Sequence, residues 1–410
     1  MDNVCNIGYK IGSEFIGPMI FSYVNYVLDN CIEKDVKKVY FMARDGWLMY
    51  NCALKLQKQC SKYSALELEY LYVSRLSLRL PQYYVTDIAT SIESIFSKES
   101  NNTLQRFFSR VKFTGEEICS VMEDINSSQT SLNKNLTENQ MDTYKKLLAS
   151  SKIFKKLLEE KSKKAYEEIR QYLNYVDMVS QDKLAIVDSG WVGSIQESLL
   201  LLLKSFGFSG QIVGYYFGMY QKRENTSESQ YNTYYFSGDG DVLKKAYFNN
   251  NMFEILCSAN HGMTIGYKKN DDNSVVPILA DYKYCAGKDE VQKGAIDNIK
   301  IISTKDIYKN LKRLMHRPKK CYVDFLKDIS FSDSLSDDDL ISIAKKISFK
   351  QASTLLFPVA VFLKLTGQSN KKVKVFWEEG SITNSYFLFK RFFCFNVLVV
   401  KILAYMKKRN

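Results

Sequence analysis

The stretch at residues 184–196, with the sequence LAIVDSGWVGSIQ, constrains the fold of this chain more than any other. Its four leading apolar residues are typical of a buried strand in a parallel sheet. Asp188 and a loop with two glycines follow, and the Leu-rich run at 195–203 indicates a helix. A strand, a Gly loop and a helix N-terminus together offer backbone N–H groups to a phosphate. The alternative is an ordinary tight β-α turn with an aspartate near the helix start.

A second stretch has the same order of elements. Residues 39–42 predict a buried strand, residues 43–46 a loop, and residues 47–59 a helix. Ligands of open α/β sheets bind at the carboxyl ends of the strands. We therefore expect Asp45 and Asp188, which follow the two strands, to lie in one shared site.

Two more strands extend this sheet. Residues 66–73 and 211–219 are apolar enough to predict strands, and the first of them ends at a segment that carries Arg75 and Arg79. In a parallel sheet these arginines lie at the same edge as the aspartates. The expected fold class is α/β, a Rossmann-like and mostly parallel sheet with a helical insertion and a helical C-terminal region.

The length of 410 residues exceeds one ordinary core, and composition suggests where the chain divides. We expect an α/β core from residues 1–86 and 179–267 and a helical insertion at 87–178 that covers the site. A helical and loop-containing region should follow at 268–385, and an amphipathic basic tail at 386–410. The segment at 137–140 is a capping box that starts a helix within the insertion.

The tail is both apolar and basic. Residues 392–406 contain only Asn396 and Lys401 as clear polar breaks, and Lys390 and Arg391 precede them. No stretch approaches about 20 uninterrupted apolar residues, so we expect no membrane-spanning helix. The pattern instead fits an interfacial helix, which predicts a cytoplasmic protein in peripheral contact with the inner face of a membrane. A buried C-terminal helix is the alternative.

Composition narrows the function classes. A net charge of +12 suits an anionic ligand, membrane or nucleic acid, but the Lys are scattered and no Arg-rich or aromatic-basic motif points to nucleic acid. Only His261 and His316 are present, which disfavours a His-built metal site. Nine Cys without a CxxC pair, and a first segment without signal-peptide character, indicate a reducing compartment.

The segment at residues 251–262, NMFEILCSANHG, sets polar groups among apolar ones. Its simplest interpretation is a short helix with a Gly stop. The alternative is that Glu254 and His261 line the site.

Five short stretches resemble the second half of bacterial polysaccharide-cluster proteins that are often labelled HAD-family hydrolases. They lie at residues 16–18, 40–46, 73–75, 187–196 and 258–262, so the likeness covers most of the chain. In that family a separate N-terminal unit usually carries an Asp-x-Asp nucleophile motif, in which a phosphatase needs one aspartate as nucleophile and the other as acid/base. Here neither Asp45 nor Asp188 belongs to such a motif. A HAD-like phosphohydrolase and a non-catalytic polysaccharide-assembly protein remain alternatives.

Two loops also resemble those of type I phosphoribosyltransferases. Residues 43–46 are similar to their pyrophosphate loop, and residues 187–194 to the loop that holds the ribose 5-phosphate. The second loop is one residue shorter here, and its acidic pair is reduced to Asp188–Ser189. The resemblance implies a glycosyltransferase that moves a 5-phosphoribosyl group from phosphoribosyl pyrophosphate to a surface-polysaccharide acceptor, such as a lipid-linked O-antigen or capsule glycan. A separate HAD phosphatase would then remove the 5-phosphate.

The resemblance also implies roles for individual residues. Asp188 would hold ribose hydroxyls and stabilise the cationic ring, and Asp45 and Glu254 are candidates to deprotonate the acceptor. Mg²⁺ would enter mainly with the donor pyrophosphate, without a direct protein ligand. The donor- and phosphate-binding residues would be Arg44, Gly46, Arg75, Ser189, Gly190, Trp191, Gly193 and Ser194. Further cleft candidates are Arg79, Gln196 and His261.

Overall fold

Five parallel strands form the centre of the molecule. The computed structural model describes residues 2–97, 102–282, 284–331, 341–360, 362 and 375–407. The strands are paired in the order β2-β1-β3-β4-β5, and every pair is parallel. Their bounds are β1 Lys38–Met42, β2 Glu67–Leu71, β3 Lys183–Trp191, β4 Gln211–Met219 and β5 Ser229–Phe236. The expectation of an α/β fold with a mostly parallel sheet is confirmed.

The strand order has a reversal point between β1 and β3. The chain runs outward from β1 to β2 and then returns past β1 to add β3, β4 and β5 on the other side. In open parallel sheets a crevice forms where the winding direction reverses, at the carboxyl ends of the two strands. The two stretches on which the sequence analysis rests are therefore neighbours at the position where such folds bind ligands.

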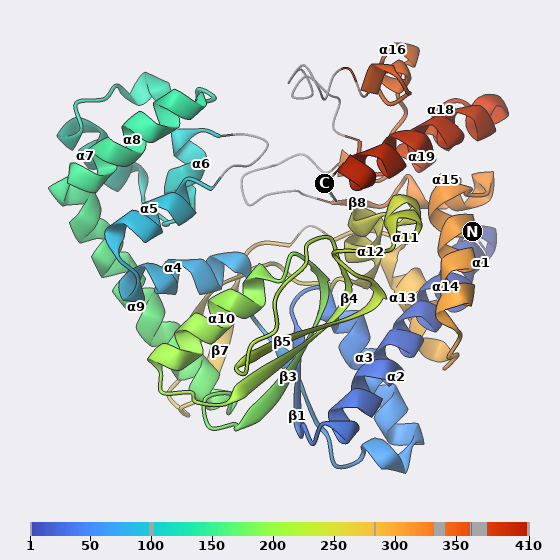
Figure 1. Cartoon of the computed structure of the whole chain (residues 1–410), viewed down its shortest axis with the longest axis horizontal. Helices are drawn as coiled ribbons and strands as arrows, with labels where there is room; N and C mark the ends of the chain where they lie inside the picture. The colour runs from blue at the N-terminus through green and yellow to red at the C-terminus, as the bar shows by residue number, and fades with distance from the viewer. Residues whose placement is uncertain are drawn as a thin grey trace.

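Helices cover both faces of the sheet (Figure 1). Because both faces are buried, β3 is apolar at successive positions: Ala185 and Val187 point to one core, and Leu184 and Ile186 to the other. The first face carries α2 (Gly17–Glu33), α3 (Gly46–Gln59), α12 (Asn250–Cys257) and α13 (Lys288–Asp297). The second carries α4 (Arg75–Val85), α9 (Lys152–Tyr175) and α10 (Ser194–Ser205).

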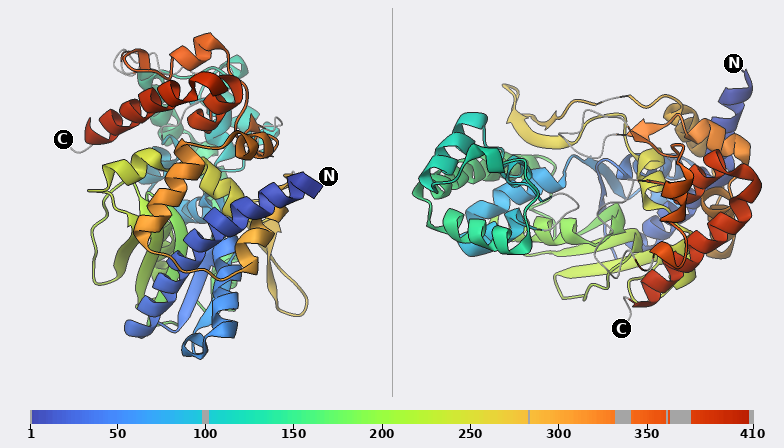
Figure 2. Two further views of the ribbon diagram at one scale, coloured as in Figure 1. Left: turned by 90° about the vertical axis from the view of Figure 1, so that its right-hand side faces the viewer. Right: turned by 90° about the horizontal axis from the view of Figure 1, so that it is seen from above.

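The insertion between β2 and β3 is a helical bundle with its own apolar core, which includes Phe107, Phe108 and Phe154. Its helices are α5 (Ile88–Ile95), α6 (Leu104–Ser109), α7 (Gly115–Asp124), α8 (Glu138–Ser150) and the first half of α9, with the 3-10 turn η3 (Gln129–Ser131). The capping box predicted at Thr137 is present at the start of α8. The bundle lies at one end of the long axis of the molecule, and the C-terminal helices lie at the other (Figures 1 and 2).

The chain begins with α1 (Asp2–Ile11) and a π-helical turn, η1 (Gly12–Ile16), that continue directly into α2. The helix predicted to start near Gly17 therefore starts earlier. Glycines allow α13 to cross this segment at close range, since a Cβ on Gly12 would lie 2.0 Å from Val291 O and one on Gly294 would lie 2.2 Å from Tyr9 O. This contact fixes the position of α13, whose first residue is Lys288.

The remaining elements follow or connect these layers. A hairpin of β6 (Thr264–Lys269) and β7 (Val275–Leu279) packs on α9, where the Tyr172 and Tyr267 rings stack at 4.4 Å. The other elements are η2 (Ser61–Tyr63), α11 (Val242–Tyr247), α14 (Thr304–Leu311), η4 (Lys312–His316), α15 (Lys320–Leu326), β8 (Ser330–Phe331), β9 (Ile341–Ser342), α16 (Phe349–Ser353), α18 (Glu378–Ser385), η6 (Phe387–Phe389) and α19 (Lys390–Lys407).

The region expected at 268–385 does not pack as one unit. Its helices α13, α14 and α15 join the core of the first sheet face, whereas α16, α18 and α19 share a smaller apolar cluster. The predicted tail helix is α19, and residues 408–410 of the expected tail lie outside the described part of the chain. No helix in that described part has both the length and the hydropathy to cross a bilayer.

Candidate functional site

Asp45 and Asp188 lie at the carboxyl ends of two paired strands. Phe41 of β1 is in register with Val187 of β3, so Asp188 follows immediately and Asp45 lies in the loop after β1. Ser189 Oγ donates a hydrogen bond of 2.8 Å to Asp45 Oδ2. Both aspartates are half-buried. The two loops therefore meet at one edge of the sheet and join through this hydrogen bond.

The loop after β1 is held by backbone hydrogen bonds on both sides. Ala43 N donates to Leu71 O at the end of β2 (2.9 Å), and Ala259 N donates to Arg44 O (3.1 Å). The peptide between Ala43 and Arg44 is cis. Gly46 starts α3 so close to β1 that a Cβ would lie 3.1 Å from the Phe41 carbonyl carbon. These contacts fix the backbone beside Asp45, while the Arg44 side chain is exposed.

The end of β3 turns sharply into α10. Gly190, Trp191 and Gly193 all have positive φ, at 110°, 71° and 76°. A Cβ on Gly190 would lie 2.3 Å from Gly218 O of β4, so only glycine fits there without a shift. Gly193 is the N-cap of α10 and offers no side chain to cap it. The first N–H groups of α10, beginning with Ser194, are consequently unpaired within the helix and available to an anion.

Trp191 was predicted to bind the donor, and the structure corrects this. Alternation along β3 places Val187, Ser189 and Trp191 on the same face of the sheet. The indole is buried against Tyr220, Phe236, Phe248 and Phe253, with ring centroids 5.4–6.2 Å apart. Its Nε1 donates a hydrogen bond to Glu254 Oε1. The Trp191 indole is thus part of the aromatic core and positions Glu254.

Three carboxyl groups at the site hold their protons more tightly than usual. Burial raises the pKa of Asp188 to about 7, and the nearby charge of Asp45 adds to this rise. Burial also raises the pKa of Glu254 to about 8, again with a contribution from Asp45, although the Trp191 hydrogen bond opposes it. Burial raises the pKa of Asp45 too, against the Ser189 hydrogen bond and the positive charge of Arg44. Burial therefore favours the protonated form of all three carboxyl groups over what an exposed carboxyl would show.

Three cations face these carboxylates. Arg44, Arg75 and Lys288 each lower the pKa of Asp45. Arg75 is the first residue of α4, where the capping box of Ser74 fixes the helix start. Lys288 Nζ donates to Ala259 O (3.2 Å) and to Tyr282 Oη (2.8 Å), and burial lowers its pKa to about 8. Lys288 was not predicted as a site residue, because nothing in the sequence around it sets it apart from the other lysines.

His261 lies beside the site as a fixed neutral group. Its Nδ1 is 2.8 Å from Gly262 O, which can only accept, so Nδ1 carries the hydrogen. Nε2 then accepts from Tyr70 Oη at 2.9 Å. Burial lowers the pKa of His261, and the charges of Arg44 and Lys288 lower it further. Both ring nitrogens are thus engaged within the protein, which suits a residue that positions the segment before β6.

Two further candidates lie away from the carboxylates. Gln196 is fully buried, donates to Ser229 Oγ (2.7 Å) and Gln230 O (3.0 Å), and accepts from Tyr216 Oη (2.6 Å). It ties α10 to β4 and β5. Arg79 lies one turn beyond Arg75 on α4, where its charge acts on Tyr83. The structure does not bring either residue into the cluster.

A cavity of about 290 Å³ lies near the start of α12 and not at the aspartates. Tyr220, which lines it, contacts Trp191 at 5.7 Å between ring centroids. Trp191 in turn donates to Glu254, so the Tyr220–Trp191 pair connects this cavity to Glu254. The other lining residues are Phe248, Asn249, Asn250, Asn251, Val375, Phe376, Glu378, Lys401, Ala404 and Tyr405.

The sequence matches no protein-family model, and a search of curated proteins gave no match. The site is therefore interpreted from its own chemistry. It combines three proton-holding carboxyl groups, three cations and an uncapped helix N-terminus at the reversal point of a parallel sheet. Cations and a helix N-terminus suit an anionic ligand, and carboxyl groups with raised pKa values suit proton transfer.

Proposed function

We propose that this chain is a phosphoribosyltransferase that moves a 5-phosphoribosyl group from phosphoribosyl pyrophosphate to a hydroxyl of a surface-polysaccharide acceptor. The observation that carries the proposal is the meeting of the two strand-end loops, joined by the hydrogen bond from Ser189 to Asp45. Cations lie beside one loop, the N-terminus of α10 lies beyond the other, and the aspartates lie between. A donor with a pyrophosphate at one end and a phosphate at the other matches this order of charges.

The two ends of the donor find different partners. Arg44 and Arg75, with Lys288, would neutralise the pyrophosphate, which is negatively charged both before and during transfer. The 5-phosphate would bind the backbone N–H groups and hydroxyl at the start of α10, from Gly193 and Ser194. Mg²⁺ commonly binds substrate phosphates, and here it would enter mainly with the donor pyrophosphate, without a direct protein ligand. When bound, it would neutralise charge on the leaving pyrophosphate.

The transfer step exchanges one C–O bond for another. The bond between ribose C1 and the pyrophosphate oxygen breaks, and pyrophosphate leaves with the electron pair. The ribosyl centre becomes oxocarbenium-like, and the Asp188 carboxylate stabilises its positive charge. The acceptor hydroxyl oxygen then bonds to C1, and its proton passes to Asp45 or Glu254. A general base must be ionised before it accepts this proton, and because the pKa of Glu254 is about 8, transfer that uses Glu254 should become faster as the pH rises toward that value.

The product of this reaction keeps its 5-phosphate. A glycan with an unphosphorylated ribofuranose would need a separate phosphatase, and a HAD enzyme is the proposed partner. The competing function is a phosphohydrolase in which Asp45 or Asp188 attacks a phosphate directly. That reaction would release inorganic phosphate without an acceptor.

Incubation of the protein with phosphoribosyl pyrophosphate, Mg²⁺ and a synthetic or lipid-linked glycan tests the proposal. The expected result is pyrophosphate release that depends on the acceptor, together with a phosphoribosyl mass added to the glycan in mass spectrometry. Release of inorganic phosphate without any adduct would assign the hydrolase function. A protein that neither binds the donor nor transfers from it to any acceptor would contradict both enzymatic functions and leave a role in assembly.

A further inference from the structure

Large apolar side chains are exposed in the C-terminal part of the molecule. On η6 and α19 they are Leu388, Phe389, Phe392, Phe395, Leu403 and Met406, and around α16 they are Phe349, Phe357 and Val359. Leu388 is 89% exposed and Phe392 is 63% exposed. We propose that these residues, named here the C-terminal apolar surface, dock the protein on an anionic lipid bilayer.

The exposed residues of α19 form one stripe. Phe392, Phe395, Leu403 and Met406 recur at intervals compatible with 3.6 residues per turn and lie on one side of the helix. The opposite side is also apolar, and it is buried in the protein through Phe393, Cys394, Val397, Leu398 and Val400. The helix therefore has one apolar face used in folding and a second that nothing in the described chain covers.

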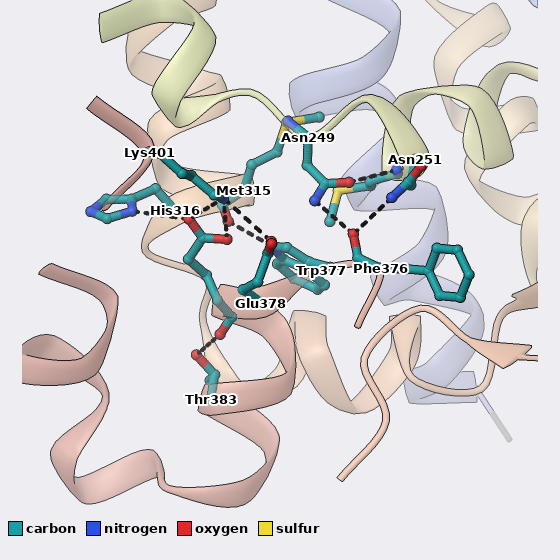
Figure 3. A network of polar contacts seen from close by, with 11 residues as sticks. Asn249, Asn251, Met315, His316, Phe376, Trp377, Glu378, Thr383 and Lys401 are labelled. Carbon is teal, nitrogen blue, oxygen red and sulfur yellow. Dashed lines mark hydrogen bonds and ion pairs between the residues drawn. The ribbon is translucent and has the colours of Figure 1, made fainter. Parts of the chain in front are cut away.

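A buried ion network fixes which face of α19 points inward (Figure 3). Lys401 Nζ lies 2.8 Å and 3.0 Å from the two oxygens of Glu379 and 3.4 Å from Glu378 Oε2. His316 Nδ1 of η4 is 3.5 Å from Glu379 Oε1. Glu379 is only 1% exposed, so rotation of α19 would leave a buried carboxylate without its cation. The helix cannot turn its outer stripe into the core without this penalty.

A row of aromatic rings connects α16 to α19. Phe349 is 6.4 Å from Tyr386, Tyr386 stacks on Phe393 at 5.5 Å, and Phe393 is 5.7 Å from Phe392. The two ends of this row, Phe349 and Phe392, are exposed. The buried Phe393 ring therefore packs α16 and α19 together beneath the exposed residues of both elements.

The charge distribution identifies the occupant. Residues 341–410 contain thirteen Lys and Arg but only two acidic residues, which is +11 of the net charge of +12 of the whole chain. Those two acids, Glu378 and Glu379, both contact Lys401. Arg391 and Lys407 are exposed at the two ends of the α19 stripe. Apolar side chains flanked by cations match a bilayer with anionic headgroups, whereas a second copy of this surface would be repelled.

The docking surface is linked to the candidate site. Tyr405 of α19 stacks on Tyr220 at 5.8 Å, and Tyr220 contacts Trp191, which holds Glu254. A protein docked through α19 would therefore hold its carboxylates at a set distance from the lipid headgroups. This consequence rests on the proposed function, because it matters for a lipid-linked acceptor, but the docking itself does not depend on the transfer chemistry.

Vesicle flotation with the full chain tests the inference, without donor or acceptor. We expect binding to vesicles of phosphatidylcholine with about one third phosphatidylglycerol, weaker binding in high salt, and little binding to phosphatidylcholine alone. The triple variant Phe392→Gln, Phe395→Gln, Leu403→Gln should bind these vesicles at least about tenfold more weakly than the wild type. The matched control Ile153→Gln, Tyr175→Gln removes exposed apolar residues from α9 and should bind like the wild type. Circular dichroism and thermal unfolding verify that each variant is folded.

Three results would overturn the proposal. In the first, the wild type binds neither kind of vesicle. In the second, the triple variant of α19 and the control variant of α9 lose vesicle binding equally. In the third, the wild type is a dimer and the triple variant is a monomer. The last would assign the surface to a second copy. Transfer to a short water-soluble acceptor is measured in parallel, so a failure of docking is distinguishable from a failure of the proposed chemistry.

Discussion

Ser189 donates its hydroxyl hydrogen to Asp45 across 144 positions of sequence, and this bond joins the loop after β1 to the end of β3. The bond lowers the pKa of Asp45 against the effect of burial. Ser189→Ala should therefore raise the pKa of Asp45 and lower transfer by about 10-fold to 100-fold, the scale of a hydrogen bond to a charged group. Ser189→Thr keeps the hydroxyl and should retain more activity. Equal loss in both variants would show that the space at this position matters and not the bond.

Asp188→Asn keeps the shape of the side chain and removes its charge. If the carboxylate stabilises a cationic ribosyl centre, transfer should fall by about 10²-fold to 10⁴-fold with little change in donor affinity. Steady-state kinetics on the glycan acceptor, with calorimetric binding of the donor, separates the two quantities. Full activity in this variant would end the proposed mechanism.

The same substitution changes stability in a pH-dependent way. The folded-state pKa of Asp188 is about 7 against an ordinary value of 3.8, so the folded state holds more protons between these values and loses stability as the pH rises through them. Asn has no charge to bury. At pH 8 the variant should therefore be more stable than the wild type, by about 1–2 kcal/mol after allowance for solvent screening, and nearly equal to it at pH 4. Urea unfolding at the two pH values measures the difference.

Arg75 and Arg79 form a matched pair one turn apart on α4. Arg75→Ala should raise the donor KM and lower turnover, because its charge acts on the carboxylate cluster where the pyrophosphate would bind. Arg79→Ala should leave both parameters near wild type, since its charge acts on Tyr83. A larger effect from Arg79 than from Arg75 would show that the pyrophosphate lies elsewhere.

Trp191→Phe tests the link between the aromatic core and Glu254. The indole hydrogen bond lowers the pKa of Glu254, so its loss should raise that pKa above about 8. If Glu254 accepts the proton, the inflection of the rate against pH should move to higher pH in Trp191→Phe and disappear in Glu254→Gln. If the inflection does not move in Trp191→Phe, Glu254 is not the base, and Asp45 becomes the candidate.

The strand-end loops at residues 39–46 and 184–190 could be predicted from the sequence. Apolar strands that end in an aspartate and a glycine loop have a simple periodic signal, and a parallel sheet brings such ends together. Trp191 was misplaced because β3 continues four residues beyond its apolar run, which sends alternate side chains into the core. Gln196 was predicted to line the cleft, but its side-chain amide hydrogen-bonds to β4 and β5 and is buried between α10 and these strands. Local spacing carries no information on such distant partners.

Lys288 shows a different limit. Its charge acts on Asp45 from the start of α13, a helix that crosses α1 where a Cβ on Gly294 would lie 2.2 Å from Tyr9 O. The contact between Gly294 and Tyr9 is remote from the carboxylates. It sets the position of α13 and therefore of Lys288, its first residue. The added Cβ of Gly294→Ala would push α13 away from α1 and would displace the Lys288 ammonium group at the start of α13. A packing position about two turns from Lys288 would thus control where this cation lies relative to the carboxylates, and under the proposed function a substitution there would change donor affinity without changing any group that binds the donor.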